Sequence, residues 1–149
     1  MKVSDNISLT EATKSQTATR KGIDNNPNAE QLKNMRLVAE NCFQPLREMY
    51  GKAIGISSFF RSEVLNKAIG GSRTSDHCKG KAIDIDADIY NNGITNADIF
   101  EWLKENVPFD QLIWEYGNDK EPNWVHVSFR KSGNRGQVLK ATKKGYIKL

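Results

Sequence analysis

The sequence has few of the residues on which disulfide-bonded, zinc-finger or membrane proteins depend. It contains only two cysteines, Cys42 and Cys78, which lack the paired spacing of a zinc finger, and we expect both to be free thiols. No apolar run approaches the length that a membrane-spanning helix needs, so we expect no membrane insertion. The chain also has only two histidines, His77 and His126. Metal or acid–base chemistry that uses imidazole must therefore involve these two positions.

The charge of the chain lacks the arrangement that nucleic-acid binding requires. Lysine and arginine number 22 against 18 acidic residues, for a net charge of +4. This balance favours polyanionic surroundings, including nucleic acid or the anionic polymers of bacterial walls. The basic residues are scattered, however, and no aromatic-and-basic array or helix-turn-helix signature is present. We therefore expect no nucleic-acid partner.

Length and the N-terminal segment limit the organisation of the chain. At 149 residues, we expect one domain over residues 1–149, monomeric and too small to carry a separate wall-binding module. The first residues lack the apolar core of a signal peptide, so we expect synthesis in the cytoplasm without such a peptide. Residues 1–27 are polar and predict an ordered N-terminal arm.

Hydrophobic periodicity predicts strands interleaved with helices. The predicted helices cover residues 9–15, 29–50, 61–69 and 95–106, and the predicted strands cover residues 53–59, 82–87, 110–116 and 124–130. The tail 138–149 predicts a further edge strand, and the polar loop 117–123 predicts a hairpin between its two flanking strands. The resulting fold class is α+β, with helices packed against a small, mainly antiparallel sheet.

A metal site is indicated where a polar turn leads into the strand 82–87. His77 lies just before this turn, in which Gly80 permits backbone angles that other residues resist. Along the strand, Ile83 and Ile85 point to one face and Asp84 to the other. An imidazole and a carboxylate can converge on one divalent cation, but two ligands do not hold zinc.

His126 supplies the third ligand of the predicted site. It is the only other histidine, and it shares one face of its strand with Trp124 and Ser128, whereas Val125, Val127 and Phe129 form the other face. Three protein ligands leave one zinc position open for water, which is typical of a catalytic site. The thiolate of Cys78 is an alternative ligand, but its place next to His77 turns it elsewhere. The sequence thus predicts a Zn²⁺ site on the sheet face.

The motifs resemble those of a known peptidase family. The pattern S-x-H-x-x-G-x-A-x-D over residues 75–84, followed by W-x-H over 124–126, is similar to the zinc D-alanyl-D-alanine carboxypeptidases. That family includes bacteriophage cell-wall endopeptidases, and the zinc-binding domain of Hedgehog proteins is similar in fold. The resemblance extends to residues 15–25, 57–62 and 70–72. It implies a hydrolase of peptidoglycan stem peptides, either a D,D-carboxypeptidase or an endopeptidase, such as a phage lysis or tail enzyme that reaches the wall after release.

The general base is where the sequence departs from the family pattern. Many relatives have a carboxylate three residues before the last histidine, where this chain has Asn123, which cannot accept a proton. We prefer Glu115, because a hairpin that sets Glu115 opposite His126 brings both side chains to one face. The Hedgehog-like branch supports this choice, since a glutamate there precedes the final histidine from the neighbouring strand. The alternatives are loop bases at Asp119 or Glu121, or an exposed strand carboxylate at Glu115.

Two further residues are candidates for substrate binding. The resemblance implies that Arg61 binds the scissile carbonyl or its oxyanion, and a fixed guanidinium suits charge that develops in the transition state. Its alternative is a surface arginine at a helix start. Ser75 can bind substrate or hold the His77 turn. For the whole chain, the second hypothesis is a non-catalytic, Hedgehog-like zinc module that binds a partner, which Asn123 favours and which Glu115 with Arg61 opposes.

Overall fold

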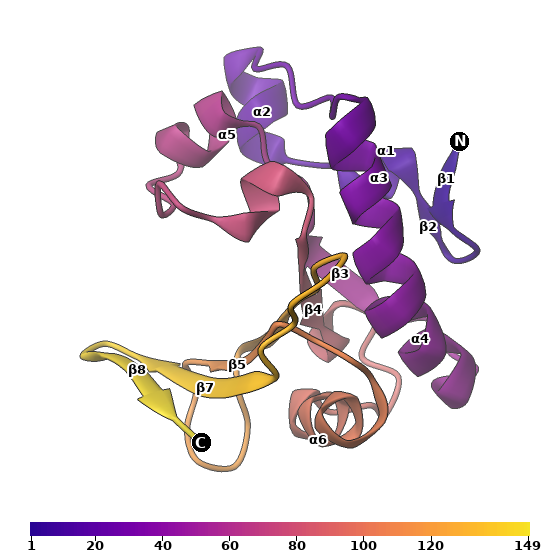
Figure 1. The fold of residues 1–149 in the computed structure, drawn as a ribbon, viewed down its shortest axis with the longest axis vertical. Helices are drawn as coiled ribbons and strands as arrows, with labels where there is room; N and C mark the ends of the chain where they lie inside the picture. The colour runs from indigo at the N-terminus through magenta and orange to yellow at the C-terminus, as the bar shows by residue number, and fades with distance from the viewer.

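A six-stranded sheet forms the centre of the protein in a computed structural model that describes all residues 1–149. Its strands are β3 (Gly55–Ser58), β4 (Ala82–Asp86), β5 (Gln111–Glu115), β6 (Trp124–Ser128), β7 (Gln137–Thr142) and β8 (Gly145–Lys148). Their order is β3-β4-β6-β5-β7-β8, and Figure 1 shows β7 and β8 extending from the sheet at its outer end. Every neighbouring pair is antiparallel except β5 with β7. The predicted α+β class with a mainly antiparallel sheet is confirmed.

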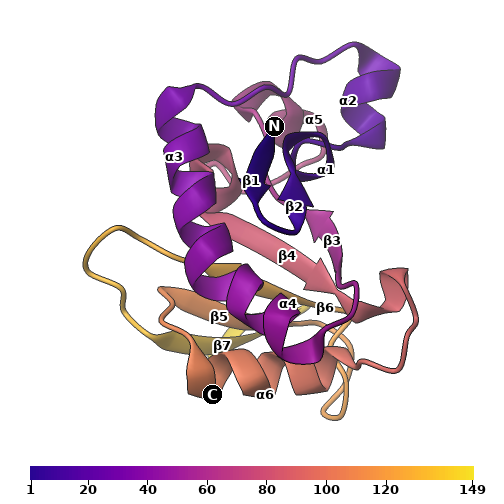
Figure 2. The ribbon, with the colours of Figure 1, turned by 90° about the vertical axis from the view of Figure 1, so that its right-hand side faces the viewer.

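The longer helices cover one face of this sheet (Figures 1 and 2). They are α3 (Ala29–Val38), continued through the π-helical turn η1 (Ala39–Phe43) into α4 (Gln44–Tyr50), and α6 (Asn96–Asn106). The main core lies between these helices and the sheet. Its members include Met35, Phe43, Leu46, Ile83, Ile85, Phe100, Leu112, Val125 and Val127. The opposite face of the sheet is therefore free of long helices.

The long helix 29–50 was predicted, but its π-helical turn was not. Pro45 has no N–H to donate to the carbonyl four residues earlier, and its ring crowds that carbonyl. Just before Pro45, over Ala39–Phe43, the α-helix changes to a wider π-helical turn. The side-chain amide of Asn41 donates to the Leu37 carbonyl at 2.8 Å, which gives that carbonyl a partner at this irregular turn.

Residues 1–27 are ordered and pack against the rest of the domain. They form β1 (Lys2–Ser4), β2 (Ile7–Ser8), α1 (Leu9–Ala12) and α2 (Gln16–Lys21). Val3, Ile7 and Ala12 are buried in the main core, so this segment is polar in composition but not detached. Farther along, the Asn25 side chain donates to the Phe60 carbonyl and accepts from the Ser62 N–H.

The short elements around the open face complete the fold. They are α5 (Glu63–Ala68), η2 (Asp76–Lys79) and η3 (Ala87–Ile89). Helix α5 starts later than the predicted helix 61–69, because the Ser62 hydroxyl accepts from the Leu65 N–H and caps it. Arg61 consequently lies in the loop before α5 and not on the helix. No helix is both long and apolar enough to cross a lipid bilayer.

Candidate metal centre

His77, Asp84 and His126 converge on the open face of the sheet. Nε2 of His77 lies 3.2 Å, and Nδ1 of His126 lies 2.9 Å, from Oδ1 of Asp84. One donor atom from each of the three residues lies within 4.8 Å of the other two. Ligands bound tetrahedrally to zinc at about 2.0–2.1 Å are separated from one another by about 3.4 Å. The three side chains thus have the spacing of a single metal site.

The strand register places two of these ligands side by side. Asp84 on β4 lies directly opposite His126 on β6. Their sequence neighbours Ile83, Ile85 and Val125 are fully buried in the core, so alternation directs the two polar side chains to the other face. The prediction that the cluster lies on the sheet face is confirmed, whereas the direct pairing of the two strands was not predicted.

The third ligand comes from a turn that the sequence specifies closely. The Ser75 hydroxyl accepts from the His77 N–H at 3.2 Å and starts the turn η2. Gly80 ends it with φ of +75°, and a Cβ there would lie 2.4 Å from the Gln31 carbonyl oxygen of α3. Only glycine meets both requirements. Gly80 therefore fixes the path that carries the chain from His77 into β4.

A hydrogen bond orients the His77 ring for metal binding. Its Nδ1 lies 2.6 Å from the Phe59 carbonyl oxygen and donates to it, which directs Nε2 towards Asp84. Metal-bound histidines usually make such a bond to a carbonyl or carboxylate through the second ring nitrogen. With two imidazoles and one carboxylate as donors, these residues fit a zinc ion.

The charges of the cluster are strongly coupled. Burial raises the pKa of the Asp84 carboxyl, but the charge of His77 and hydrogen bonds from both histidines outweigh it and hold that pKa below its usual range. Burial lowers the pKa of His126, yet the hydrogen bond and charge of Asp84 raise it on balance. Asp84 is therefore ionised and available as a ligand, and a metal at this site competes with protons for His126.

Glu115 lies beside this cluster, although not at the predicted pairing position. It is opposite Trp124, and Ile113 is the residue opposite His126, so the hairpin register differs from the expected one by two residues. A register shift of two residues keeps the Glu115 side chain on the same face as the ligands, whereas a shift of one residue would turn it to the opposite face. Burial raises the pKa of Glu115 to about 7, Asp84 adds to the rise and His126 opposes it.

The loop carboxylates are engaged elsewhere. Glu121 accepts from the Ala97 N–H at 2.6 Å in the first turn of α6, and Asp119 is exposed and pairs with Lys140. Asn123, where the resemblance leads one to expect a carboxylate, is exposed, and its N–H donates to the Glu115 carbonyl. Among the acidic candidates, Glu115 alone lines the pocket of the metal cluster.

Arg61 and Ser75 lie together at the edge of the same pocket. Nη2 of Arg61 donates to the Ser75 hydroxyl at 3.3 Å, and its buried Nε has no hydrogen-bond partner. No carboxylate forms an ion pair with this guanidinium. The Ser75 hydroxyl both starts the His77 turn and contacts Arg61, so its position agrees with the turn-holding role. Arg61 itself lies between Phe60 and Ser62, the two residues whose backbone Asn25 holds.

The cluster opens into a pocket of about 630 Å³. The segment 69–76 forms one wall, and Leu139 and Tyr146 of β7 and β8 belong to the other. A second pocket, of about 560 Å³, lies along β3, the edge strand of the sheet, and shares Arg61 and Ile69 with the first. The open face thus carries two adjoining hollows that meet at Arg61.

Sequence reasoning did not single out the aromatic rim of the metal pocket. Tyr116 and Trp124 lie with ring centroids 5.6 Å apart, and Tyr146 lines the same pocket. Tyr116 has a φ of +56°, a conformation that is uncommon for residues other than glycine. In this conformation the Tyr116 N–H donates a hydrogen bond to the Ala141 carbonyl. The pairing register of the strands brings these aromatic residues together, and the sequence alone does not reveal that register. Trp114, by contrast, packs edge-on against Phe100 in the core.

The cysteines have no part in the cluster. Both are free thiols, as predicted. Cys42 is buried in the core and donates to the Pro108 carbonyl, and burial raises its pKa to about 12. Cys78 lines a separate small hollow with Asn66 and Arg73, on the far side of its turn from the ligands. A thiolate ligand is therefore excluded by position.

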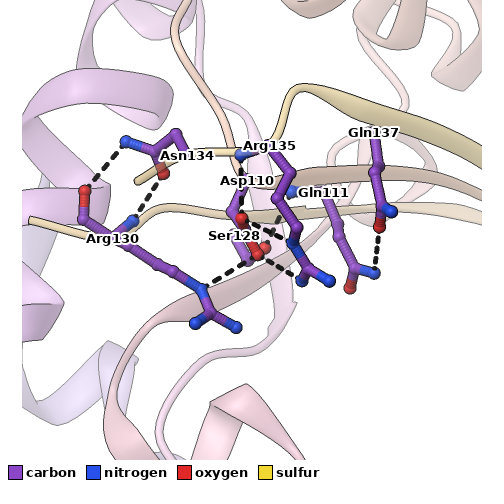
Figure 3. A network of polar contacts seen from close by, with 7 residues as sticks. All are labelled: Asp110, Gln111, Ser128, Arg130, Asn134, Arg135 and Gln137. Carbon is purple, nitrogen blue, oxygen red and sulfur yellow. Dashed lines mark hydrogen bonds and ion pairs between the residues drawn. The ribbon is translucent and has the colours of Figure 1, made fainter. Parts of the chain in front are cut away.

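A network around Asp110 fixes the connection from β6 to β7 (Figure 3). The Asp110 carboxylate accepts from Nε of Arg130, and from the N–H, Nε and Nη2 of Arg135. The Asn134 side chain closes the turn onto the Arg130 backbone, and Gln111 bonds Gln137. These contacts set β7 beside β5 and so position the second wall of the pocket.

Comparison with known proteins adds a family assignment. Residues 5–128 match the family described as Peptidase M15. No curated protein matches the chain. The matched segment ends with β6, so the Asp110-linked turn and the β7–β8 hairpin follow it.

Proposed function

Since the chain belongs to the Peptidase M15 family, we propose that it is a zinc peptidase that hydrolyses amide bonds in peptidoglycan stem peptides. The observation that carries this proposal is the convergence of His77, Asp84 and His126 in a pocket that Glu115 and Arg61 also line. As a wall hydrolase, it would act at the bacterial cell wall after release from the cell.

The three ligands would hold the metal through Nε2 of His77, a carboxylate oxygen of Asp84 and Nδ1 of His126. A zinc ion bound there supplies a Lewis acid that polarises the scissile carbonyl and makes water a stronger acid. The Phe59 carbonyl holds the His77 ring in the required tautomer. Asp84 contributes the negative charge that attracts a divalent cation.

Glu115 is suited to move the protons of the reaction. Its carboxylate accepts a proton from the attacking water and returns it to the leaving amine. A pKa raised to about 7 matches this task, because the group can both accept and release a proton near neutrality. Burial against the sheet holds the Glu115 carboxylate in one place, whereas Asp119 is exposed to solvent and pairs with Lys140.

Arg61 is suited to bind the oxygen of the scissile carbonyl. Its guanidinium has no ion-pair partner and retains a buried Nε without an acceptor. Donors fixed in advance stabilise charge that develops on oxygen in the transition state. A partner-binding zinc module has no need of an unpaired arginine and a buried glutamate in one pocket, so these two residues favour the peptidase over that second hypothesis.

The second pocket favours cleavage within a chain over removal of a terminal residue. It adjoins the metal pocket at Arg61 and runs along the free edge of β3, where an extended peptide can continue. A carboxypeptidase site needs space for only one residue beyond the scissile bond. We therefore expect endopeptidase activity on a stem peptide that spans both pockets.

Digestion of purified peptidoglycan by the zinc-loaded protein tests the function. Mass spectrometry of the soluble products should show new amino and carboxyl termini at one stem-peptide bond, with internal fragments exceeding released single alanines. Release of terminal alanine alone would identify a carboxypeptidase. A protein that binds zinc but releases no fragment would make the partner-binding module the better conclusion.

A further inference from the structure

The strand pairings align residues in rows across the open face of the sheet. One row runs from Asp84 through His126, Ile113 and Leu139. The next runs from Trp124 through Glu115 and Ala141 to Tyr146 on β8. Residues directly paired on neighbouring strands share a face, so Tyr146 emerges on the same face as the metal cluster.

The residue between Glu115 and Tyr146 is small. Ala141 separates them in the row, and its methyl group leaves room above the sheet for a larger neighbouring side chain. Two strand spacings place the Cα atoms of Glu115 and Tyr146 about 10 Å apart, within the combined reach of their side chains. Tyr146 lines the metal pocket together with Glu115 and both histidines, although its side chain remains largely exposed.

The electrostatic surroundings of Tyr146 agree with this placement. Burial raises the pKa of its phenol, and the charges of Glu115 and Asp84 raise it further. The hydroxyl thus lies within electrostatic range of the cluster and keeps its proton. A neutral phenol can donate one hydrogen bond and present an aromatic face at the same time.

The hairpin that carries Tyr146 lies outside the residues that match the family. That match ends at residue 128, whereas the second wall comes from residues 137–148. Beneath Tyr146 lies a small apolar cluster of Ile113, Leu139 and Ala141, separate from the main core and on the site face of the sheet. The pocket floor on this side of the metal ligands is therefore apolar, and Tyr146 is positioned to supply a hydrogen-bond donor there.

From these observations we infer that Tyr146 is a substrate-binding residue, whose hydroxyl donates a hydrogen bond to a main-chain carbonyl of the peptide from the wall opposite Arg61. The inference rests on the proposed peptidase function and names a binding residue for it. Arg61 follows β3 at one edge of the sheet, and Tyr146 lies on β8 at the other. A peptide lying across the metal ligands is then held from both ends of the sheet.

Kinetics of Tyr146→Phe and Tyr146→Ala, on the soluble stem peptide that the digest identifies as substrate, test this role. Loss of one neutral hydrogen bond should raise KM about three- to tenfold in Tyr146→Phe with kcat nearly unchanged. Tyr146→Ala also loses the ring and should raise KM more than tenfold. Ile147→Ala is the matched control, because Ile147 is the next residue, exposed and on the opposite face.

Zinc content and melting temperature of all three variants should equal those of the wild type, which separates substrate binding from a structural role. Wild-type KM in Tyr146→Ala would overturn the inference and leave the peptidase function intact. Calorimetric titration of the same peptide into the zinc-loaded Glu115→Gln protein decides the matter without turnover. The double variant Glu115→Gln/Tyr146→Phe should bind more weakly by the same factor, and equal binding would again overturn the role of Tyr146.

Discussion

Glu115 and Arg61 both have environments that fold stability alone does not favour. Glu115 is 8% exposed, and burial raises its pKa to about 7. The Nε atom of Arg61 is buried without an acceptor. A desolvated carboxylate and an unpaired buried donor each cost folding free energy. Buried titratable groups and unpaired donors of this kind are common at functional sites. A substrate can accept the free hydrogen bond, and a carboxylate with a shifted pKa can transfer a proton.

Replacement of Glu115 by glutamine tests the general base. Glutamine keeps the shape and the hydrogen-bonding capacity of the side chain but cannot accept a proton. Hydrolysis of peptidoglycan should fall by roughly two to four orders of magnitude, while the zinc content measured by elemental analysis stays level.

The loop carboxylates supply the controls for this variant. Glu121→Gln and Asp119→Asn should change the rate little, because Glu121 bonds α6 and Asp119 pairs with Lys140. Full activity in Glu115→Gln together with loss of activity in either loop variant would move the base to the loop.

Replacement of Arg61 by alanine separates transition-state binding from metal binding. Loss of a fixed donor to the developing oxyanion should lower kcat by about a hundredfold or more. Zinc content should not change, because Arg61 contacts Ser75 and not a ligand side chain. Undiminished turnover in this variant would return Arg61 to the role of a surface arginine.

At the scale of elements, sequence alternation predicted the faces of strands but not their register. The buried Ile83 and Ile85 fix the direction of Asp84, because period-two alternation leaves one choice once a face is buried. The hairpin pairing of Glu115 with Trp124 depends on the conformation of the loop 117–123 and of Tyr116, which composition does not specify. The predicted face was therefore right although the predicted partner was wrong.

The path of the C-terminal hairpin was also beyond sequence reasoning. An edge strand was expected in 138–149, whereas two strands form there and β7 runs parallel to β5. The contacts that support this pairing are the hydrogen bonds of the Asp110 carboxylate with Arg130 and Arg135, which lie 20 and 25 positions farther along the chain. Hydrophobic periodicity carries no information on such long-range polar contacts.

Asp110→Asn tests whether this network stabilises the protein. Hydrogen bonds from Arg135 lower the pKa of Asp110 to about 2 against the opposing effect of burial, with the charge of Arg130 helping. A depressed folded-state pKa gives stability that is complete above about pH 4 and is lost as the pH falls towards 2. At pH 7 the free energy of unfolding of the variant should be about 1–2 kcal/mol lower than that of the wild type, after allowance for the partly exposed arginines.

Denaturant titrations at pH 7 and near pH 2 measure this difference. It should shrink at the lower pH, where the wild-type carboxylate is also protonated. Asp119→Asn is the control. Because that carboxylate is exposed, loss of its pairing with Lys140 should leave the unfolding curve unchanged. A pH-independent difference for Asp110→Asn would mean that packing, and not charge, explains the effect.

For the whole molecule, the core and the metal ligands lie on opposite faces of one sheet. The main core contains 25 buried residues, from Val3 near the start of the chain to Phe129 just after β6. None of the three ligands belongs to it. This separation distinguishes the protein from small zinc domains, in which metal binding supplies most of the folding free energy. The fold should therefore persist without metal, although it should be less stable.

Removal of zinc by a chelator should lower the melting temperature without unfolding the protein at 25 °C. Zinc at a hundred times its dissociation constant stabilises a folded site by about 2.7 kcal/mol, which corresponds to roughly 5–10 °C for a chain of this size. Scanning calorimetry of the zinc-loaded and chelated protein measures the shift. Elemental analysis should find near one zinc per chain, and His126→Ala should lose both the zinc and the shift, because two remaining ligands do not hold the ion. Unchanged zinc content in His126→Ala would refute the ligand assignment, and a chelated protein that is already unfolded at 25 °C would show that the core depends on the metal after all.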